Sequence, residues 1–474
     1  MSLCFYNTIT RRSEEFLPLE GGRVRMYHCG PTVYSSPTIG NFRSFLLGDL
    51  LRRYLEYRGY QVLQVMNITD VGHIRDDQDE GEDKIEVAAR RERLDPWAIA
   101  ERYTQEFLHG VEWLHLKKAH HYPRATQHIA QMIALIEKLL AKGYAYIAES
   151  GTIYFEVNRF APYGTLSANI LDGLMTGARI EENPEKRDPR DFALWKIDPH
   201  HLMQWDSPWG RGFPGWHIEC SAMSMHYLGP SFDIHTGGED NIFPHHECEI
   251  AQAEAATGRT FVRYWLHARH LLVEGQKMAK SAGNYITLKE LEEQGHSGAA
   301  VRLMLIRAHY RQQLNFTLEG LREAQVVVDR LENLVQRLEE TAAEGEAVDE
   351  VRNLIESEKR AFCAALDDDL NISPALAALH EIVSEANRRE PKGADAQAFL
   401  DAIQEIDSVL GLLHGGRAIL PEEIEKLIAE REQARKRKDY ATADRIRGEL
   451  RARRIELMDT KEGVRWRRVR GQTA

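Results

Sequence analysis

Two short segments carry residues suited to chemistry on a nucleoside triphosphate. One is Lys277-Met278-Ala279-Lys280-Ser281, where two lysines and a serine lie between Gly275 and Gly283. The other is the Gly/Pro-rich turn Cys29-Gly30-Pro31-Thr32-Val33-Tyr34, which is followed by Ile39-Gly40. Such chemistry needs a binding site for the adenine and mobile positive charge, which holds the phosphates while negative charge develops on them in the transition state. Together, and in this order, the two segments predict a nucleotide site.

A second candidate site consists of side chains that bind metals. Cys29 ends a predicted strand, Cys220 lies in Gly215-Trp216-His217-Ile218-Glu219-Cys220, and Pro244-His245-His246-Glu247-Cys248-Glu249 opens a predicted helix. Residues four apart on a helix share a face, so we expect His245 and Glu249 to point together and His246 to point elsewhere. Two thiolates, an imidazole and a carboxylate make a plausible zinc shell. Because these residues are about 220 positions apart, the shell can form only in the folded domain, which favours a catalytic or substrate-binding role.

The same spacing also has a structural interpretation. Cys29 and Cys220 can be buried as small apolar side chains, and the two histidines can cap or pack the helix. Cys248 is a competing ligand, although it falls off the face shared by His245 and Glu249. The spacing alone does not decide between these interpretations.

The elements on either side of the Gly/Pro-rich turn have the pattern of a βαβ unit. Residues 23–29 predict a strand, the apolar period that begins at Asn41 and stops at Gly59 predicts a helix, and residues 61–68 predict a second strand. A right-handed parallel crossover follows by default. We therefore predict an α/β fold with a doubly wound, Rossmann-like parallel sheet, whose ligands lie at the carboxyl ends of the strands.

The rest of the chain divides by its patterns. Two long helical patterns (97–116 and 125–142) and a hairpin near Ser150-Gly151 predict an insertion into the nucleotide fold. Periodic apolar residues after Gly298 predict a helical bundle, Gly415-Gly416 a hinge, and the segment from Pro421 one last helix. The predicted parts are the catalytic first half, the insertion, the catalytic second half, the bundle and a basic C-terminal region, over residues 1–83, 84–210, 211–297, 298–414 and 415–474.

Length, charge and cysteine content limit the class of protein. A chain of 474 residues is too long for one core, and five scattered cysteines argue against a disulfide framework. We expect a cytoplasmic protein without a membrane span or a signal peptide. The net charge is −12, yet the residues from Arg435 onward hold 14 Lys/Arg against six Asp/Glu, a net +8. A basic end on an acidic body suits a polyanion that docks in one place, although a solvated basic helix face would read the same way.

The motifs resemble, in order and over nearly the whole chain, those of the cysteinyl-tRNA synthetases, a class I aminoacyl-tRNA synthetase family. The resemblance is carried by the two opening segments and by four further stretches: Asn67-Ile68-Thr69-Asp70, Gly215 to Met223, Phe232-Asp233-Ile234-His235 and Phe243 to Glu247.

The resemblance implies roles for particular residues. The zinc ligands would be Cys29, Cys220, His245 and Glu249, and the amino-acid pocket would hold Thr32, Thr69, Trp216 and His235. ATP would bind at Gly30, Gly40, Gly237, Gly238, Asp240 and Lys280, and the catalytic residues would be Thr38, Asn41, Lys277 and Lys280. Trp216 also has a structural interpretation, as a core aromatic residue.

This chain departs from the family pattern at several positions. Thr38-Ile39-Gly40-Asn41 stands where the family has His-Ile-Gly-His, so neither flanking residue carries positive charge. Thr38 can donate a hydrogen bond to a phosphate oxygen, and Asn41 offers an amide donor at a helix N-terminus. Ala279 replaces a serine in a loop that keeps both lysines, and Thr236 replaces a glycine, which we expect to be tolerated.

The resemblance therefore implies a monomeric ligase that activates L-cysteine with ATP and Mg²⁺ and passes it to tRNA(Cys), with one zinc ion per chain. Zinc prefers a thiolate to a neutral hydroxyl, so serine would be rejected at the first step, where a hydrophobic pocket alone rejects it poorly. The basic tail, which includes Trp466, would read the anticodon region. Two alternatives are a cysteine ligase with a small amino-sugar acceptor and a non-catalytic paralogue that senses tRNA or cysteine. The basic tail opposes the first, and the intact zinc shell and lysine loop oppose the second.

Overall fold

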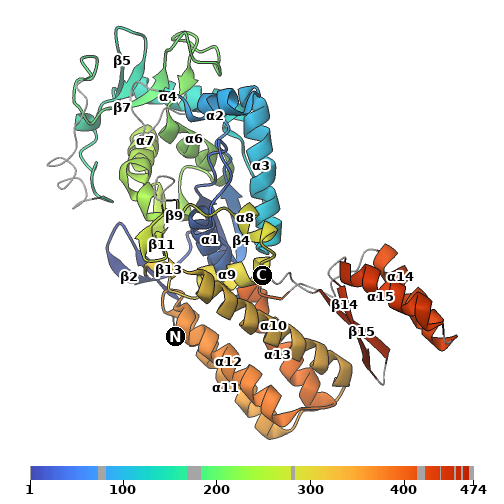
Figure 1. Ribbon diagram of the computed structural model, residues 1–474. Coiled ribbons are helices and arrows are strands. Elements are labelled where there is room, and N and C mark those ends of the chain that lie inside the picture. The colour runs from blue at the N-terminus through green and yellow to red at the C-terminus, as the bar shows by residue number, and fades with distance from the viewer. Residues whose placement is uncertain are drawn as a thin grey trace.

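The computed structural model describes residues 2–72, 82–167, 183–278, 283–413, 422–437, 439–452, 455–460 and 463–468. An α/β body, with an insertion at one end and a helical bundle at the other, makes up most of it (Figure 1). Among the described residues, no helix is both long and apolar enough to cross a membrane.

A parallel sheet of four strands lies at the centre of the α/β body. Its strand order is β10-β9-β3-β4, and every pair of neighbours is parallel. The strands and the helices packed on them are β3 (Arg23–His28), α1 (Ile39–Tyr57), β4 (Gln61–Met66), α6 (Trp216–Leu228), β9 (Phe232–Gly238), α7 (Glu247–Thr257) and β10 (Val262–Ala268). The predicted βαβ unit at the start of the chain is confirmed.

Alternate residues of the sheet face two separate cores. Met26 of β3 packs in the core that includes α1, while its neighbour Tyr27 packs in the core that includes α6 and α7. Successive side chains of a strand point to opposite faces, so helices cover both faces of this sheet, as a doubly wound fold requires. The predicted fold class is confirmed.

The insertion carries helices and a second sheet. Both predicted helices are present, and the hairpin near Ser150-Gly151 is the first part of an antiparallel sheet of four strands, in the order β5-β6-β7-β8. The elements are α2 (Lys84–Glu92), α3 (Pro96–Trp113), η2 (Ala125–Gln127), α4 (Ile129–Ala141), β5 (Ala145–Ile147), β6 (Ile153–Phe155), η3 (Val157–Arg159), β7 (Phe192–Lys196) and β8 (Phe213–Pro214).

Smaller elements connect the catalytic sheet to the helical bundle. An N-terminal hairpin was not expected, because its second strand, Arg-Ser-Glu-Glu, is polar and has no apolar alternation. The remaining elements here include a sheet of three strands in the order β12-β11-β13, with β11 parallel to β13. They are β1 (Cys4–Asn7), β2 (Arg12–Glu15), η4 (Glu239–Asn241), η5 (Ile242–His246), β11 (Leu271–Val273), β12 (Gln276–Lys277), α8 (Leu288–Glu293), α9 (Gly298–Ile306) and β13 (Leu314–Phe316).

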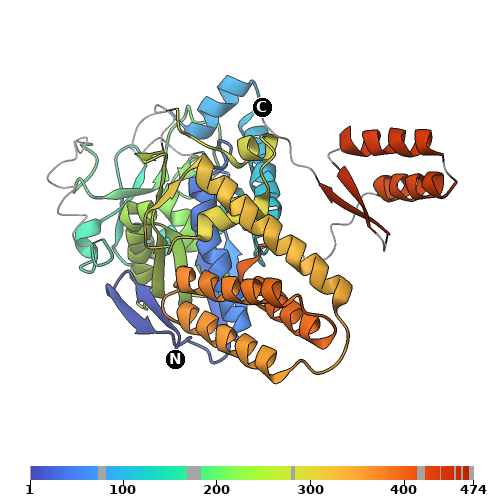
Figure 2. The same ribbon diagram turned by 60° about the horizontal axis from the view of Figure 1, so that its bottom comes forward.

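The helical bundle follows, as predicted, and lies beneath α1 and α9 (Figures 1 and 2). Its helices are α10 (Leu318–Thr341), α11 (Asp349–Asp367), α12 (Ile372–Arg389) and α13 (Ala394–Leu410). α13 contacts α1 directly, so the bundle shares the core of the α1 face of the sheet.

The C-terminal segment stands to one side of the bundle in both views (Figures 1 and 2). The prediction of one last helix was wrong, since two helices are present and a hairpin follows them. The second helix was missed because its start, at Asp439 and Tyr440, lies in a run of charged residues without a proline or glycine break. The elements are α14 (Glu422–Lys436), α15 (Tyr440–Ala452), β14 (Ile455–Thr460) and β15 (Gly463–Arg468). The predicted hinge, Gly415-Gly416, lies outside the described residues.

Candidate metal centre and active site

The structure brings together the four side chains that the sequence suggested as metal ligands. Cys29 follows the carboxyl end of β3, Cys220 lies in α6, His245 lies in the η5 turn, and Glu249 lies in the first turn of α7. One ligand atom from each of the four lies within 4.8 Å of those of the other three. Only Cys29 is more than slightly exposed, at 8%. The parallel sheet thus places the cluster where ligands of this fold bind.

The spacing of these atoms fits a tetrahedral zinc shell. Bonds of about 2.3 Å to sulfur and about 2.0–2.1 Å to nitrogen or oxygen imply S–S edges of about 3.8 Å and N–O edges of about 3.3 Å. The Cys29 and Cys220 Sγ atoms are 3.9 Å apart, and His245 Nε2 lies 3.1 Å from Glu249 Oε1. Cys29 Sγ is 3.6 Å from the same carboxylate oxygen.

The electrostatics of the cluster favour a positive charge at its centre. Burial opposes the shift, but Cys220 and Glu249 raise the pKa of His245 to about 10. Burial alone would raise the pKa of Cys220, yet hydrogen bonding with Cys29 and the nearby His245 lower it to about 7. Burial would raise the pKa of Glu249, but His235 and His245 lower it to about 2. Burial, with Cys220 and Glu249, raises the pKa of Cys29, so this thiol keeps its proton in the absence of a metal. A metal ion at the centre can take the place of the Cys29 and His245 protons.

His246 does not point away from this cluster, so the expectation from helical spacing was wrong. Its Nε2 atom lies 3.2 Å from Cys29 Sγ. Residues 242–246 form a wider π-helical turn, and Phe243 within it has non-helical backbone angles. The rule that residues four apart share a face assumes a regular α-helix. His245 and Glu249 still point together, as expected, and the turn breaks the assumption at His246.

A chain of buried histidines stands behind the ligands. His246 Nδ1 lies 2.8 Å from His267 Nε2, and His267 Nδ1 lies 2.8 Å from Thr8 Oγ1. Burial lowers the pKa of both histidines, so they are neutral. If the Thr8 hydroxyl donates to His267 Nδ1, then His267 Nε2–H donates to His246 Nδ1. His246 Nε2–H in turn donates to Cys29 Sγ. No pattern in the sequence indicates this chain, because its members come from three distant segments.

The expected substrate residues lie around the cluster at different depths. His235 is fully buried, and its Nε2 lies 3.0 Å from Glu249 Oε2, so it contacts a candidate ligand instead of lining an open pocket. Trp216 is half-buried with its ring 4.6 Å from that of His245. Thr32 and Thr69 face each other in a short parallel bridge, and Thr69 donates to Glu219 Oε2 at 2.9 Å.

Protein packing accounts for two of the glycines that were expected at the ATP site. A Cβ atom on Gly30 would overlap the carbonyl oxygen of Asn67, and one on Gly238 would overlap the Asp240 carboxylate. A Cβ on Gly237 would lie 2.7 Å from His246 Cε1, and one on Gly40 would lie 3.0 Å from Met278 Cε. At Gly30 and Gly237, where the neighbours are a main-chain carbonyl and a buried ring, packing alone requires glycine. At Gly40 and Gly238 the neighbour is the end of a side chain, so packing alone does not require glycine there. Asp240 itself is exposed, in η4.

Thr38 and Asn41 form a capping box at the start of α1. The Thr38 N–H and hydroxyl both donate to Asn41 Oδ1, at 2.9 and 2.7 Å, and the Asn41 N–H donates to Thr38 Oγ1 at 3.3 Å. Thr38 is buried and Asn41 is exposed. The Thr38 hydroxyl was expected to donate a hydrogen bond to a phosphate oxygen, but in this structure it donates to Asn41 Oδ1. In return, the amide of Asn41 is oriented with its NH₂ group away from the cap.

The lysine loop is described only in part. Lys277 is exposed in β12, and its carbonyl oxygen accepts a hydrogen bond from the Asn284 side chain at 3.1 Å. Lys280 lies outside the described residues, as do Ala279 and Ser281.

Comparison with known proteins places the chain in a family. Residues 15–326 match the family described as tRNA synthetases class I (C) catalytic domain. Residues 361–414 match the DALR domain, and residues 417–467 match the cysteinyl-tRNA ligase anticodon binding domain.

Individual relatives are similar over almost their full length. A cysteine–tRNA ligase of Thermus thermophilus is 46% identical over 98% of this chain and 99% of its own length. A cysteine–tRNA ligase of Caldicellulosiruptor saccharolyticus is 44% identical over the same shares. A solved methionyl-tRNA synthetase of Mycobacterium tuberculosis, in complex with methionyl-adenylate, matches the fold with a TM-score of 0.59 at 16% identity, covering 82% of this chain and 90% of its own. The chain belongs to the cysteine–tRNA ligase family, within the class I tRNA synthetases.

Proposed function

We propose that the protein joins L-cysteine to tRNA(Cys) in an ATP-dependent reaction. The cysteine carboxylate attacks the α-phosphate of ATP, which gives cysteinyl-adenylate and pyrophosphate, and the cysteinyl group is then transferred to the 3′-terminal adenosine of the tRNA. The main support is the convergence of Cys29, Cys220, His245 and Glu249 at the carboxyl end of the sheet, in a chain similar to cysteine–tRNA ligases from end to end.

The four converging side chains would hold one zinc ion. When bound, zinc supplies a strong preference for a thiolate over a neutral hydroxyl, which distinguishes cysteine from serine. The residues behind the shell keep it in place: His235 holds Glu249, and His246 holds Cys29. Trp216 packs on His245 and gives the pocket an apolar wall beside the ligands.

The nucleotide would lie at the N-terminus of α1, beside the lysine loop. The free NH₂ group of Asn41, together with the positive end of the helix, can donate to phosphate oxygens where the family has histidine. Thr38 would orient that amide. Lys280 would stabilise the leaving pyrophosphate, which carries Mg²⁺, and Lys277 would support the closed loop.

The five-part domain division predicted from the sequence would then separate two tasks. Residues 1–83 and 211–297 would activate cysteine, with 84–210 as the connecting insertion. The helices of 298–414 and the basic residues of 415–474 would bind the tRNA, whose phosphates match the net +8 charge from Arg435 onward.

The test is transfer of labelled cysteine to total tRNA in the presence of ATP and excess serine. We expect cysteine to be charged and serine to have little effect. Cysteine-dependent pyrophosphate exchange without charging of tRNA would point to another acceptor, such as an amino sugar. Loss of both activities in a folded, zinc-loaded protein would contradict the proposal and favour a non-catalytic binding protein.

A further inference from the structure

Arg43, in the second turn of α1, is a buried cation without a carboxylate partner. Its exposure is 4%, and none of the described acidic residues forms an ion pair with it. Burial lowers the pKa of Arg43 to about 10, so the guanidinium is still charged at neutral pH. A buried arginine is rare unless its charge is matched, so what surrounds this one needs an explanation.

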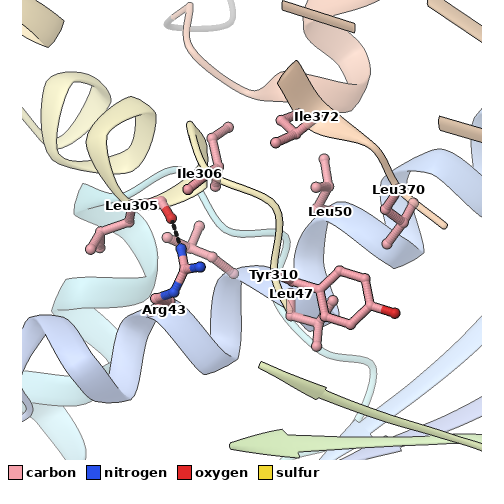
Figure 3. Close-up of a pocket in the computed structure, with 10 residues that line it drawn as sticks. Arg43, Leu47, Leu50, Leu305, Ile306, Tyr310, Leu370 and Ile372 are labelled. Atoms are coloured by element: carbon pink, nitrogen blue, oxygen red, sulfur yellow. Dashed lines mark hydrogen bonds between the residues drawn. The ribbon is translucent and has the colours of Figure 1, made fainter. Parts of the chain in front are cut away.

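Four main-chain carbonyl oxygens take the place of a carboxylate. Arg43 Nε donates to Arg269 O at 3.1 Å, and Nη1 donates to Leu305 O at 2.6 Å. Nη2 donates to His309 O at 3.1 Å and to Gln312 O at 2.8 Å. Figure 3 shows the guanidinium directed at the Leu305 carbonyl oxygen. Leu305 lies in the last turn of α9, where the negative end of the helix dipole favours a cation.

Two of the other carbonyls lie just before paired strands, and the first of these strands leads into the lysine loop. Arg269 lies two residues before β11, and Gln312 lies two residues before β13. These two strands pair with each other, and β11 forms a hairpin with β12, which holds Lys277. One side chain of α1 thus fixes the points at which both strands begin.

The exit from the loop is also held by α1, at its first turn. Thr38 pairs with Thr287 in an antiparallel bridge, and Ile39 N–H donates to Ile286 O at 3.2 Å. The segment that carries the lysines is therefore anchored to the same helix on both sides, by Arg43 before it and by residues 37–39 after it.

Arg43 also lines a mainly apolar pocket between α1, α9 and the bundle. Its walls include Leu47 and Leu50 of α1, Ile306 of α9, and Leu370 and Ile372 at the edge of the bundle (Figure 3). Hydrogen bonds in such surroundings are strong, and a carbonyl left without its donor there costs free energy. The contacts of Arg43 therefore define one position of the hairpin relative to α1.

We propose that Arg43 is a positioning residue for cysteine activation, which sets the β11-β12 hairpin, with its Lys277, at the correct distance from the nucleotide-binding start of α1. This inference rests on the proposed function. It predicts that weakening the hydrogen bonds of Arg43 affects the rate of the activation step more than the binding of cysteine, because the metal cluster lies on other elements.

The test compares Arg43→Lys with Arg302→Lys. Arg302 is the control, since it is a fully buried arginine that also donates to main-chain carbonyls, of Leu410 and Leu114, and contacts neither strand of the hairpin. It differs from Arg43 in that it also pairs with Asp49. Thermal midpoints, zinc content and the kinetics of cysteine-dependent pyrophosphate exchange are measured at a temperature where both variants are folded. We expect both to lower the midpoint. Only Arg43→Lys should lower kcat, by about tenfold or more, with KM for cysteine nearly unchanged.

Equal effects of the two variants on kcat, or an unchanged kcat in Arg43→Lys, would overturn the inference. If the lysine variants do not fold, the Arg43→Gln and Arg302→Gln pair gives the same comparison without burying an ammonium group. Folding of both Arg302 variants but of neither Arg43 variant would make Arg43 a folding residue and would also overturn it. An inactive wild-type protein would instead contradict the proposed function, so the two failures are distinguishable.

Discussion

Among the described residues, the buried ionisable groups around Glu249, at the carboxyl end of the sheet, are arranged differently from those around Arg302, where α1, α9 and α13 meet. Around Arg302 the charges are matched in pairs. Its Nη2 donates to Asp49 Oδ2 at 2.5 Å, and Asp49 also accepts from Arg53 Nε at 2.9 Å and from the Lys117 N–H at 2.7 Å. Burial opposes the shift, but Arg302 and Arg53 keep the pKa of Asp49 below its usual value.

Around Glu249 the groups converge instead of pairing. Two thiols, an imidazole and a carboxylate point at one another within 4.8 Å, and their pKa values are displaced in opposite directions. Such an arrangement is completed by a cation from outside the chain, whereas the Arg302 region is complete by itself. If buried ionisable groups converge on one point, they indicate a ligand site. If each donor already has its acceptor, as around Arg302, the groups hold packed elements together.

The largest expected effect that tests this contrast is the loss of one converging donor. We expect Cys220→Ser to lose zinc and to lower the rate of cysteine-dependent pyrophosphate exchange by about 10³-fold, which equals about 4 kcal/mol. Zinc content and exchange rate are measured on the same preparation. Cys248→Ser is the control, because Cys248 is equally buried but its Sγ contacts Tyr163 Oη at 3.6 Å and is not one of the four converging donors. Retention of zinc and full activity by Cys220→Ser would contradict the assignment.

The matched region should behave in the opposite way, with a loss of stability and little loss of chemistry. Asp49→Asn leaves Arg302 buried without its carboxylate, and we expect the free energy of unfolding to fall by about 3 kcal/mol. Denaturation in urea measures this loss, and pyrophosphate exchange by the folded protein should stay within about twofold of wild type. A variant of unchanged stability but strongly reduced exchange would mean that the Arg302 region takes part in catalysis.

The groups around Glu249 could be predicted from the sequence better than those around Arg302, for a physical reason. Cysteine and histidine are chemically distinctive, so Cys29, Cys220 and His245 could be named as candidates by type and spacing, and the family resemblance then selected them. His246 was assigned wrongly because the π-helical turn is not visible in a pattern of residues. Arg302 did leave a signal, as the one charged residue in the otherwise apolar run from Ala299 to Ile306, but nothing in the sequence identifies its partner.

The same limit applies to the fold. The βαβ unit and the bundle have strong apolar periodicity and could be predicted. The N-terminal hairpin and the second C-terminal helix are short or polar, and their formation depends on contacts with distant segments.

The start of α1 gives a third and smaller test, since this helix runs from the active site to Asp49. Thr38→Ala removes the hydroxyl that orients the Asn41 amide, and we expect kcat for pyrophosphate exchange to fall by about tenfold, or about 1.4 kcal/mol. Loss of the cap should also lower stability by about 1 kcal/mol. Thr38→Ser keeps the hydroxyl and should restore both properties. An alanine variant that activates cysteine at the wild-type rate would show that the capping box has no part in the reaction.

The smallest expected effect concerns Asp407, the least well matched charge of the Arg302 region. Burial raises the pKa of Asp407 to about 6, and the N–H groups of Leu412 and Leu413 only partly offset this. An unfolded aspartate has a pKa of about 3.9, so the folded protein binds more protons than the unfolded chain between about pH 4 and 6. The contribution of Asp407 to stability therefore falls as the pH rises through this window, and the full cost is present above pH 6.

Asp407→Asn keeps the oxygen that accepts from Leu412 and removes the titrating charge. We expect the variant to be more stable than wild type by about 1–2 kcal/mol at pH 7.5 and equal to it near pH 4. Urea denaturation at several pH values measures the difference. Asp401→Asn, an exposed change in the same helix, controls for the loss of one negative charge from the surface. If Asp407→Asn destabilised the protein at pH 7.5, the carboxylate would be matched by Arg302 and Arg53 after all, and every buried charge of that region would have its partner.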